Sequence, residues 1–121
     1  MSTISFRLES LDISHNPEIT IEGYKFLTET LIMNQKYSEF KSLNIEGNMI
    51  GDLVLNQLID GLIYNRSIRF LNLSHNKITA VGARFIKHYL IDNSTIKVLL
   101  LHWNRFGAKG SKRIAKALVS N

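Results

Sequence analysis

Apolar residues follow two patterns that alternate along this chain. The first pattern recurs in four stretches, at residues 8–16, 40–48, 68–76 and 96–104. In each stretch, apolar residues occupy the first, fourth and sixth positions, and an asparagine occupies the ninth; this alternation predicts a short buried strand. Further on in each unit, apolar pairs such as Leu58 and Leu62 lie four residues apart, which is the spacing of one helical face. Each unit is therefore predicted to contain a strand, a turn and a helix.

The asparagines give the period of the repeat. The ninth-position residues are Asn16, Asn48, Asn76 and Asn104, spaced by 32, 28 and 28 residues. A second set, Asn34, Asn65, Asn93 and Asn121, closes the four units. A fixed period of this length is typical of stacked repeats. We expect the ninth-position asparagines to be structural, because their side chains can satisfy backbone groups left unpaired as the chain leaves each strand.

The motif L-x-x-L-x-L-x-x-N-x-L resembles that of the leucine-rich repeat family, in its ribonuclease-inhibitor-like class with 28-residue repeats. The resemblance extends from Leu8 to Asn121. It implies an α/β solenoid shaped as a short horseshoe arc, with four strand–helix units, a parallel sheet on the concave face and helices on the convex face. We expect one domain over 1–121, with repeats at approximately 8–39, 40–67, 68–95 and 96–121. Stacking is also expected physically, because one such unit cannot bury its apolar face alone.

Three glycines occupy equivalent places in the helical parts of the units. They are Gly23, Gly82 and Gly110, and the second unit has Val54 at this position. Because glycine has no Cβ, we expect these positions to let the backbones of helix and sheet approach closely.

Side chains that alternate with the buried ones should point out of the concave face. The outward columns are Ser10, Ser42, Phe70 and Val98; Asp12, Asn44, Asn72 and Leu100; Ser14, Glu46, Ser74 and His102; and His15, Gly47, His75 and Trp103. The face thus changes from polar and acidic in the first unit to apolar and aromatic in the fourth. We name a candidate partner-binding set, the concave patch: Phe70, Val98, Leu100, His102 and Trp103. Exposed apolar and aromatic area is typical of a contact site. Alternatively, a further repeat or the C-terminus of the chain covers these residues.

Charge is divided unevenly between the halves of the chain. Residues 1–60 hold four Lys/Arg and nine Asp/Glu, a net charge of −5, whereas residues 61–121 hold eleven Lys/Arg and one Asp, a net charge of +10. A basic docking surface for an acidic protein partner is predicted at Arg105, Lys109, Lys112, Arg113 and Lys116. The alternative is an ordinary solvated helix face. Self-association through the acidic and basic ends is a further option, whereas no aromatic and glycine motif favours nucleic acid.

Neither a metal site nor a catalytic site is expected. His15 and His75 share a column but lie two strands apart, about 9–10 Å. His75 and His102 are closer, yet the sequence suggests no third ligand beside them. Asp12, Ser14 and His15 lie on one strand, where neighbours cannot adopt the geometry of a catalytic triad. The family includes GTPase-activating proteins of the Ran type, but only the general scaffold resembles them. No enzyme activity and no cofactor are therefore predicted.

The sequence favours a noncatalytic protein-binding scaffold. There are no cysteines, no apolar run long enough to span a membrane, and no signal-peptide pattern, so we expect an intracellular, cytoplasmic protein. The alternative is a structural component of a larger assembly or a fragment of a longer repeat protein. The LHWN, G-x-x-G and IA-x-AL stretches are similar to repeats of flagellar and ciliary proteins, so cytoskeletal or ciliary association is an option.

Overall fold

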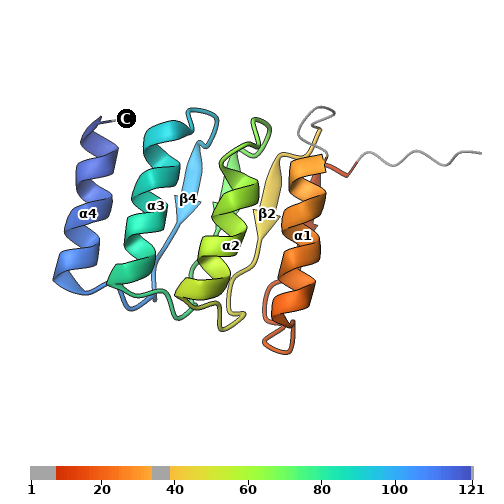
Figure 1. The fold of residues 1–121 in the computed structure, drawn as a ribbon, viewed down its shortest axis with the longest axis horizontal. Coiled ribbons are helices and arrows are strands. Elements are labelled where there is room, and N and C mark those ends of the chain that lie inside the picture. Colours follow the sequence, from red (N-terminus) through yellow and green to blue (C-terminus); the bar gives the residue numbers. More distant parts are fainter. Residues whose placement is uncertain (1–7, 34–38, 121) are drawn as a thin grey trace, which may run out of the picture.

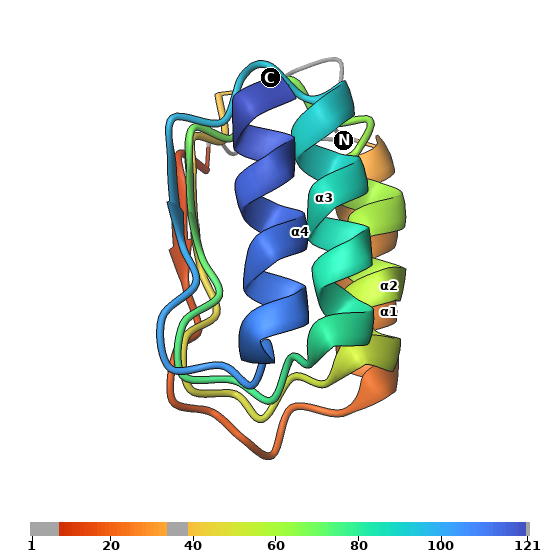
Figure 2. The ribbon, with the colours of Figure 1, turned by 90° about the vertical axis from the view of Figure 1, so that its left-hand side faces the viewer.

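The computed structural model describes residues 8–33 and 39–120, which form four successive strand–helix units. The elements in chain order are β1 (Ser10–Asp12), α1 (Ile21–Met33), β2 (Ser42–Asn44), α2 (Asp52–Leu62), β3 (Phe70–Asn72), α3 (Ala80–Asp92), β4 (Val98–Leu100) and α4 (Gly107–Ser120). The strands form one parallel sheet in the order β1-β2-β3-β4, and the helices lie side by side in the same order (Figure 1). Strands and helices make two separate layers (Figure 2). The predicted repeat solenoid is confirmed.

The strand register places equivalent residues of the repeats next to one another. Ser10 pairs with Ser42, Ser42 with Phe70, and Phe70 with Val98, so the predicted columns are neighbours in space. Backbone pairing continues beyond the strands, where the amide of His75 donates to the carbonyl of His102 at 2.9 Å. The segments that follow the strands are therefore held in register as well as the strands themselves.

The core is complete in the two central units and incomplete at the ends. Leu43, Leu58, Leu71 and Ile86 are at most 1% exposed. In the outer units, the corresponding strand residues Leu11 and Leu99 are only partly buried. The helical pairs show the same trend, because Leu58 and Leu62 are fully buried, whereas in α4 Ile114 is 9% exposed and Leu118 is 60% exposed. Within the described residues, no unit packs on the outer side of α4, so this helix keeps apolar area in solvent.

Two of the repeated glycines face the preceding helix rather than the sheet. A Cβ at Gly82 would lie 2.4 Å from the Asp52 Oδ1 atom at the start of α2, and one at Gly110 would lie 3.0 Å from the Ala80 Cα atom at the start of α3. The expected close approach is therefore present, but the expected partner was wrong at these two positions. The missing Cβ lets the N-terminal turns of neighbouring helices pack together.

Asparagines connect successive units at both ends of the strands. The Asn76 side-chain amide donates to the carbonyls of Ile45, Leu73 and Ser74, and its Oδ1 accepts from the amides of Asn48 and Ile50. We call the row Asn16, Asn48, Asn76 and Asn104 the first asparagine ladder.

A second asparagine ladder lies where the helices end. The Asn93 side chain donates to the carbonyl of Asn65 at 3.0 Å, and both residues are buried. Asn34 and Asn121 lie outside the described residues. In the described residues, side-chain hydrogen bonds of the first ladder join each unit to the next, and the Asn93–Asn65 bond of the second ladder joins the third unit to the second.

Candidate functional site

The concave patch lies on β3 and β4 and on the segment after β4. Register brings Phe70 beside Val98, and Asn72 beside Leu100. Phe70 and Leu100 are half-buried, and His102 is exposed. Val98 is 43% exposed and Trp103 is 74% exposed. The largest exposed apolar side chain of the set therefore stands at the end of the strand, not in the middle of the sheet.

A left-handed backbone turn follows every strand. The eighth-position residues are His15, Gly47, His75 and Trp103, with φ of 56°, 67°, 55° and 57°. Non-glycine residues seldom adopt this conformation, so its recurrence shows that the fold imposes the same turn on each unit. The turn brings rings from neighbouring units together, because the His75 and Trp103 rings stack at 5.7 Å with an interplanar angle of 20°. His102 approaches His75 edge-on, with ring centroids 5.3 Å apart.

A shallow hollow of about 390 Å³ lies beside these rings. Its lining residues come from the turns of the second, third and fourth units, and they are Met49, His75, Asn76, Lys77, Trp103, Asn104 and Arg105. Met49, Lys77 and Arg105 occupy the same position, directly after the first asparagine ladder. The backbone amide of Lys77 donates to Ile50, and that of Arg105 to Ile78, so these positions are held from unit to unit. We name this surface the turn hollow.

Met49 was not among the predicted site residues. It is 55% exposed and adopts a left-handed φ of 59°. The available sequence signal was its place in the column of Lys77 and Arg105, which the analysis of outward strand positions did not include. Apolar and basic side chains therefore meet in the turn hollow, a combination that suits an amphipathic protein surface.

The structure divides the predicted basic docking surface. Lys109, Lys112 and Lys116 lie on the exposed face of α4, opposite to its buried residues. The Arg113 side chain is half-buried and its Nη1 donates to the carbonyl of Ala80 at 2.9 Å, which binds α4 to α3. Arg105 instead lines the turn hollow. The helices and strands form separate layers (Figure 2), so the α4 lysines belong to the helical layer and Phe70, Val98 and Leu100 of the concave patch belong to the sheet.

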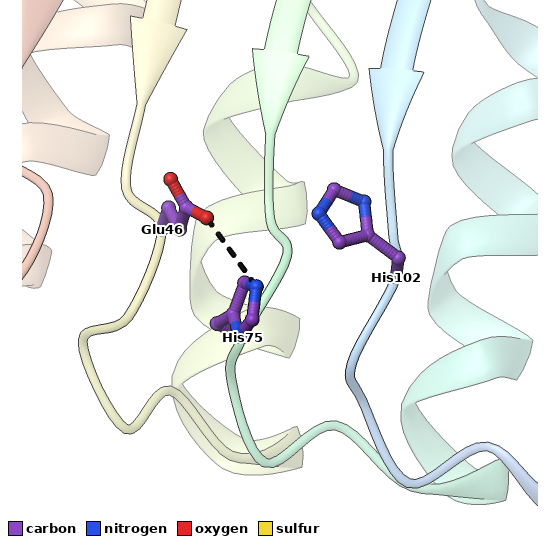
Figure 3. Close-up of side chains that lie close together, drawn as sticks. All are labelled: Glu46, His75 and His102. Atoms are coloured by element: carbon purple, nitrogen blue, oxygen red, sulfur yellow. Dashed lines mark ion pairs between the residues drawn. The ribbon is translucent and has the colours of Figure 1, made fainter.

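Glu46 is a second residue that the sequence analysis did not place in a site. Its Oε1 lies 3.6 Å from the Nε2 of His75, and its Oε2 lies 3.8 Å from the Nε2 of His15. The ligand atoms of Glu46, His75 and His102 all lie within 4.8 Å of one another (Figure 3). The expectation that no third ligand stands beside the two histidines was therefore wrong. Glu46 and His102 share the seventh column, and His75 reaches between them from the eighth.

The fragments that resemble a catalytic triad have structural roles. The Ser14 hydroxyl and backbone amide both donate to the Asp12 carboxylate, at 2.6 and 2.9 Å. These hydrogen bonds favour the charged form and hold the pKa of the Asp12 carboxyl below its usual value. The Asn72 side-chain oxygen accepts from the Ser74 backbone amide in the same way. The serines thus close the turns after their strands.

Comparison with known proteins agrees with this architecture. A family model described as a leucine-rich repeat matches residues 6–27 and 64–87. The fold of the chain is a leucine-rich repeat solenoid. A search of curated proteins gives no significant match for this leucine-rich repeat chain. No helix within the described residues is long and apolar enough to cross a membrane.

Two solved structures resemble the leucine-rich repeat chain over 93% of its length. One is titled leiomodin-1 actin-binding site 2, with 28% sequence identity and a TM-score of 0.82. The other is the tropomodulin C-terminal domain of Caenorhabditis elegans, with 15% identity and a TM-score of 0.61. The leucine-rich repeat chain covers 65% of the leiomodin-1 chain and 83% of the tropomodulin chain. It is thus shorter than both.

Proposed function

We propose that this leucine-rich repeat chain is a noncatalytic protein-binding domain, whose partner contacts the concave patch and the turn hollow. The observation that carries the proposal is Trp103, which is 74% exposed although its ring is already held against His75. An ordered, exposed tryptophan loses little side-chain entropy on binding and buries a large apolar area. Val98 and Met49 extend the apolar surface on either side.

Actin is the partner that we propose. The leiomodin-1 structure, which is titled as an actin-binding site, shares 28% identity with almost the whole of this chain. Lys77 and Arg105 in the turn hollow add positive charge and favour an acidic region of the partner. The lysines of α4 belong to the helical layer, and we propose them as a separate, weaker contact. An actin-binding role also implies an intracellular location.

The first test is binding of the chain to monomeric actin and to actin filaments. We expect Trp103→Ala to weaken the interaction roughly tenfold, or about 1.4 kcal/mol, because truncation removes the central apolar anchor. The matched control is Tyr64→Ala, which removes an aromatic side chain that is 61% exposed beyond the end of α2. An equal effect of both substitutions, or binding to neither form of actin, would contradict the proposal.

A structural component of a larger assembly is the second candidate. It is favoured by the apolar residues exposed on the outer helices, namely Phe26 at 73% and Leu118 at 60%. Light scattering at low and high salt distinguishes the candidates. A monomer at both salts supports a self-contained binding domain. Dimers or larger species that persist at high salt support association through the exposed apolar residues, and species that dissociate in salt support association through the acidic and basic ends.

A further inference from the structure

We propose that Glu46, His75 and His102 form a binding site for a divalent transition-metal ion, and that zinc suits the site best. The inference does not depend on the protein-binding role. It rests on three side chains from the segments that follow β2, β3 and β4, which come together beyond the C-terminal ends of these strands (Figure 3).

The backbone places these side chains together. Glu46 and His102 each follow their strand by two residues, and the register aligns Asn44, Asn72 and Leu100. Hydrogen bonds also join the ligand-bearing segments, from the Gly47 amide to Ser74 at 3.1 Å and from the His75 amide to His102 at 2.9 Å. The ligands therefore project from backbone segments that are hydrogen-bonded to one another, and not from independent loops.

The separation of the ligand atoms is close to what a metal requires. Zinc bonds of about 2.0–2.2 Å place two tetrahedral ligands about 3.4 Å apart. The His75 Nε2 and Glu46 Oε1 atoms are 3.6 Å apart, and all three ligand atoms lie within 4.8 Å. Small side-chain rotations, with His102 moving most, are enough to close the site. Because both histidines are exposed, water or a group of a bound partner can fill a fourth position.

Neighbouring residues already orient two of the ligands. The His75 ring stacks on Trp103, which limits its rotation. The Glu46 Oε2 atom accepts from the Asn72 side-chain amide at 3.4 Å, and Asn72 is 5% exposed. Contacts of this kind fix ligand geometry and strengthen metal binding.

The donor set determines the kind of ion. Two imidazole nitrogens and one carboxylate oxygen suit zinc and the neighbouring transition metals, whereas magnesium and calcium prefer oxygen ligands. With three protein ligands at an exposed site, we expect a dissociation constant of about micromolar, weaker than that of enclosed four-ligand zinc sites.

The experiment is a titration of the untagged chain with zinc chloride, followed by calorimetry and by tryptophan fluorescence. Trp103 is the single tryptophan of the sequence and stacks on His75, so its emission reports on that ring directly. We expect one saturable ion per chain. His102→Ala and Glu46→Gln should each weaken the binding at least about tenfold. Cobalt should give the intense visible absorption of a tetrahedral site, and both variants should lose it.

His88→Ala is the matched control, because His88 is exposed on α3 and pairs with Asp92 instead of the cluster. It should bind zinc as the parent chain does. Circular dichroism checks that the variants remain folded, and Glu46→Gln preserves side-chain shape. The proposal is overturned by the absence of saturable binding up to about 1 mM zinc, or by a His102→Ala affinity equal to that of the parent.

Discussion

Asn76 shows how one polar residue can hold a repeat array together. Its side chain makes five hydrogen bonds with backbone groups, and it is 6% exposed. Alanine would leave these buried donors and acceptors without partners, so we expect Asn76→Ala to lower the free energy of unfolding by about 3 kcal/mol. Urea denaturation measures the change.

Asn56→Ala is the control for that measurement. Asn56 lies on the exposed side of α2, and its replacement by alanine should change the free energy of unfolding by about 0.5 kcal/mol or less. A loss below about 1 kcal/mol for Asn76→Ala would mean that water satisfies the ladder as well as the side chain does.

Tyr89 gives a prediction at alkaline pH. Burial raises its pKa from 10.0 to about 12, and the positive charge of Arg66 opposes this only in part. The fold therefore favours the neutral phenol, whereas the unfolded chain loses the proton from about pH 10. The contribution to stability is fully present below pH 10 and is lost as the pH rises toward 12.

The comparison of Tyr89→Phe with the parent chain isolates this effect, because lysines titrate equally in both. Between pH 8 and pH 11 we expect the parent to lose roughly 1.4 kcal/mol more than the variant. Parallel stability curves for the two proteins would show that Tyr89 ionises in the fold as readily as in the unfolded chain.

At the scale of elements, Gly82 sets the approach of α2 and α3. A Cβ there would lie 2.4 Å from Asp52 Oδ1 and from Ile78 Cγ2. We expect Gly82→Ala to lower the free energy of unfolding by about 2 kcal/mol, even though alanine favours helices by about 1 kcal/mol. Thermal and urea denaturation would both detect it.

Gly51→Ser provides the matched glycine control. Gly51 precedes α2 with φ −101° and ψ −173°, nearly the conformation of Thr79, whose side chain caps α3. A Cβ at Gly51 meets nothing within 4 Å. A serine there should leave stability unchanged or raise it by a few tenths of a kcal/mol. If Gly82→Ala also leaves the free energy of unfolding unchanged, α2 and α3 can move apart without loss of stability.

The elements and their register were predictable from the sequence, but the site was predictable only in part. Alternation along the strands fixes which side faces the core, so Phe70 and Val98 were expected to be neighbours. The meeting of Glu46 with His75 was not expected, because it depends on the left-handed turn that follows each strand. A pattern of apolar residues does not encode that turn, and only Gly47 in the column suggested it. The contact of Gly82 and Gly110 with the preceding helix was also missed. The spacing of apolar residues shows that a helix face is buried, but not whether it packs on the sheet or on another helix.

At the scale of the whole molecule, burial falls from the centre to the ends. Leu43 and Leu71 are fully buried, whereas Leu11 and Leu99 remain partly exposed. Because each repeat contacts only its neighbours, the outer units have support on one side. In hydrogen exchange we expect amides of β1 and α4 to exchange at least about tenfold faster than those of β2 and α3. Uniform protection across the four units would instead indicate a single cooperative unit.

The two asparagine ladders have a mechanical consequence. They run across the strands. The first ladder joins each pair of neighbouring units at the C-terminal ends of the strands, and the second joins the second and third units at the N-terminal ends of β3 and β4. Tension applied between the first and last units would pass through these junctions in series. Bending that opens one end of the strands would require the asparagine hydrogen bonds at that end to break. The four units should therefore resist bending as one body, and under tension an outermost unit should separate first.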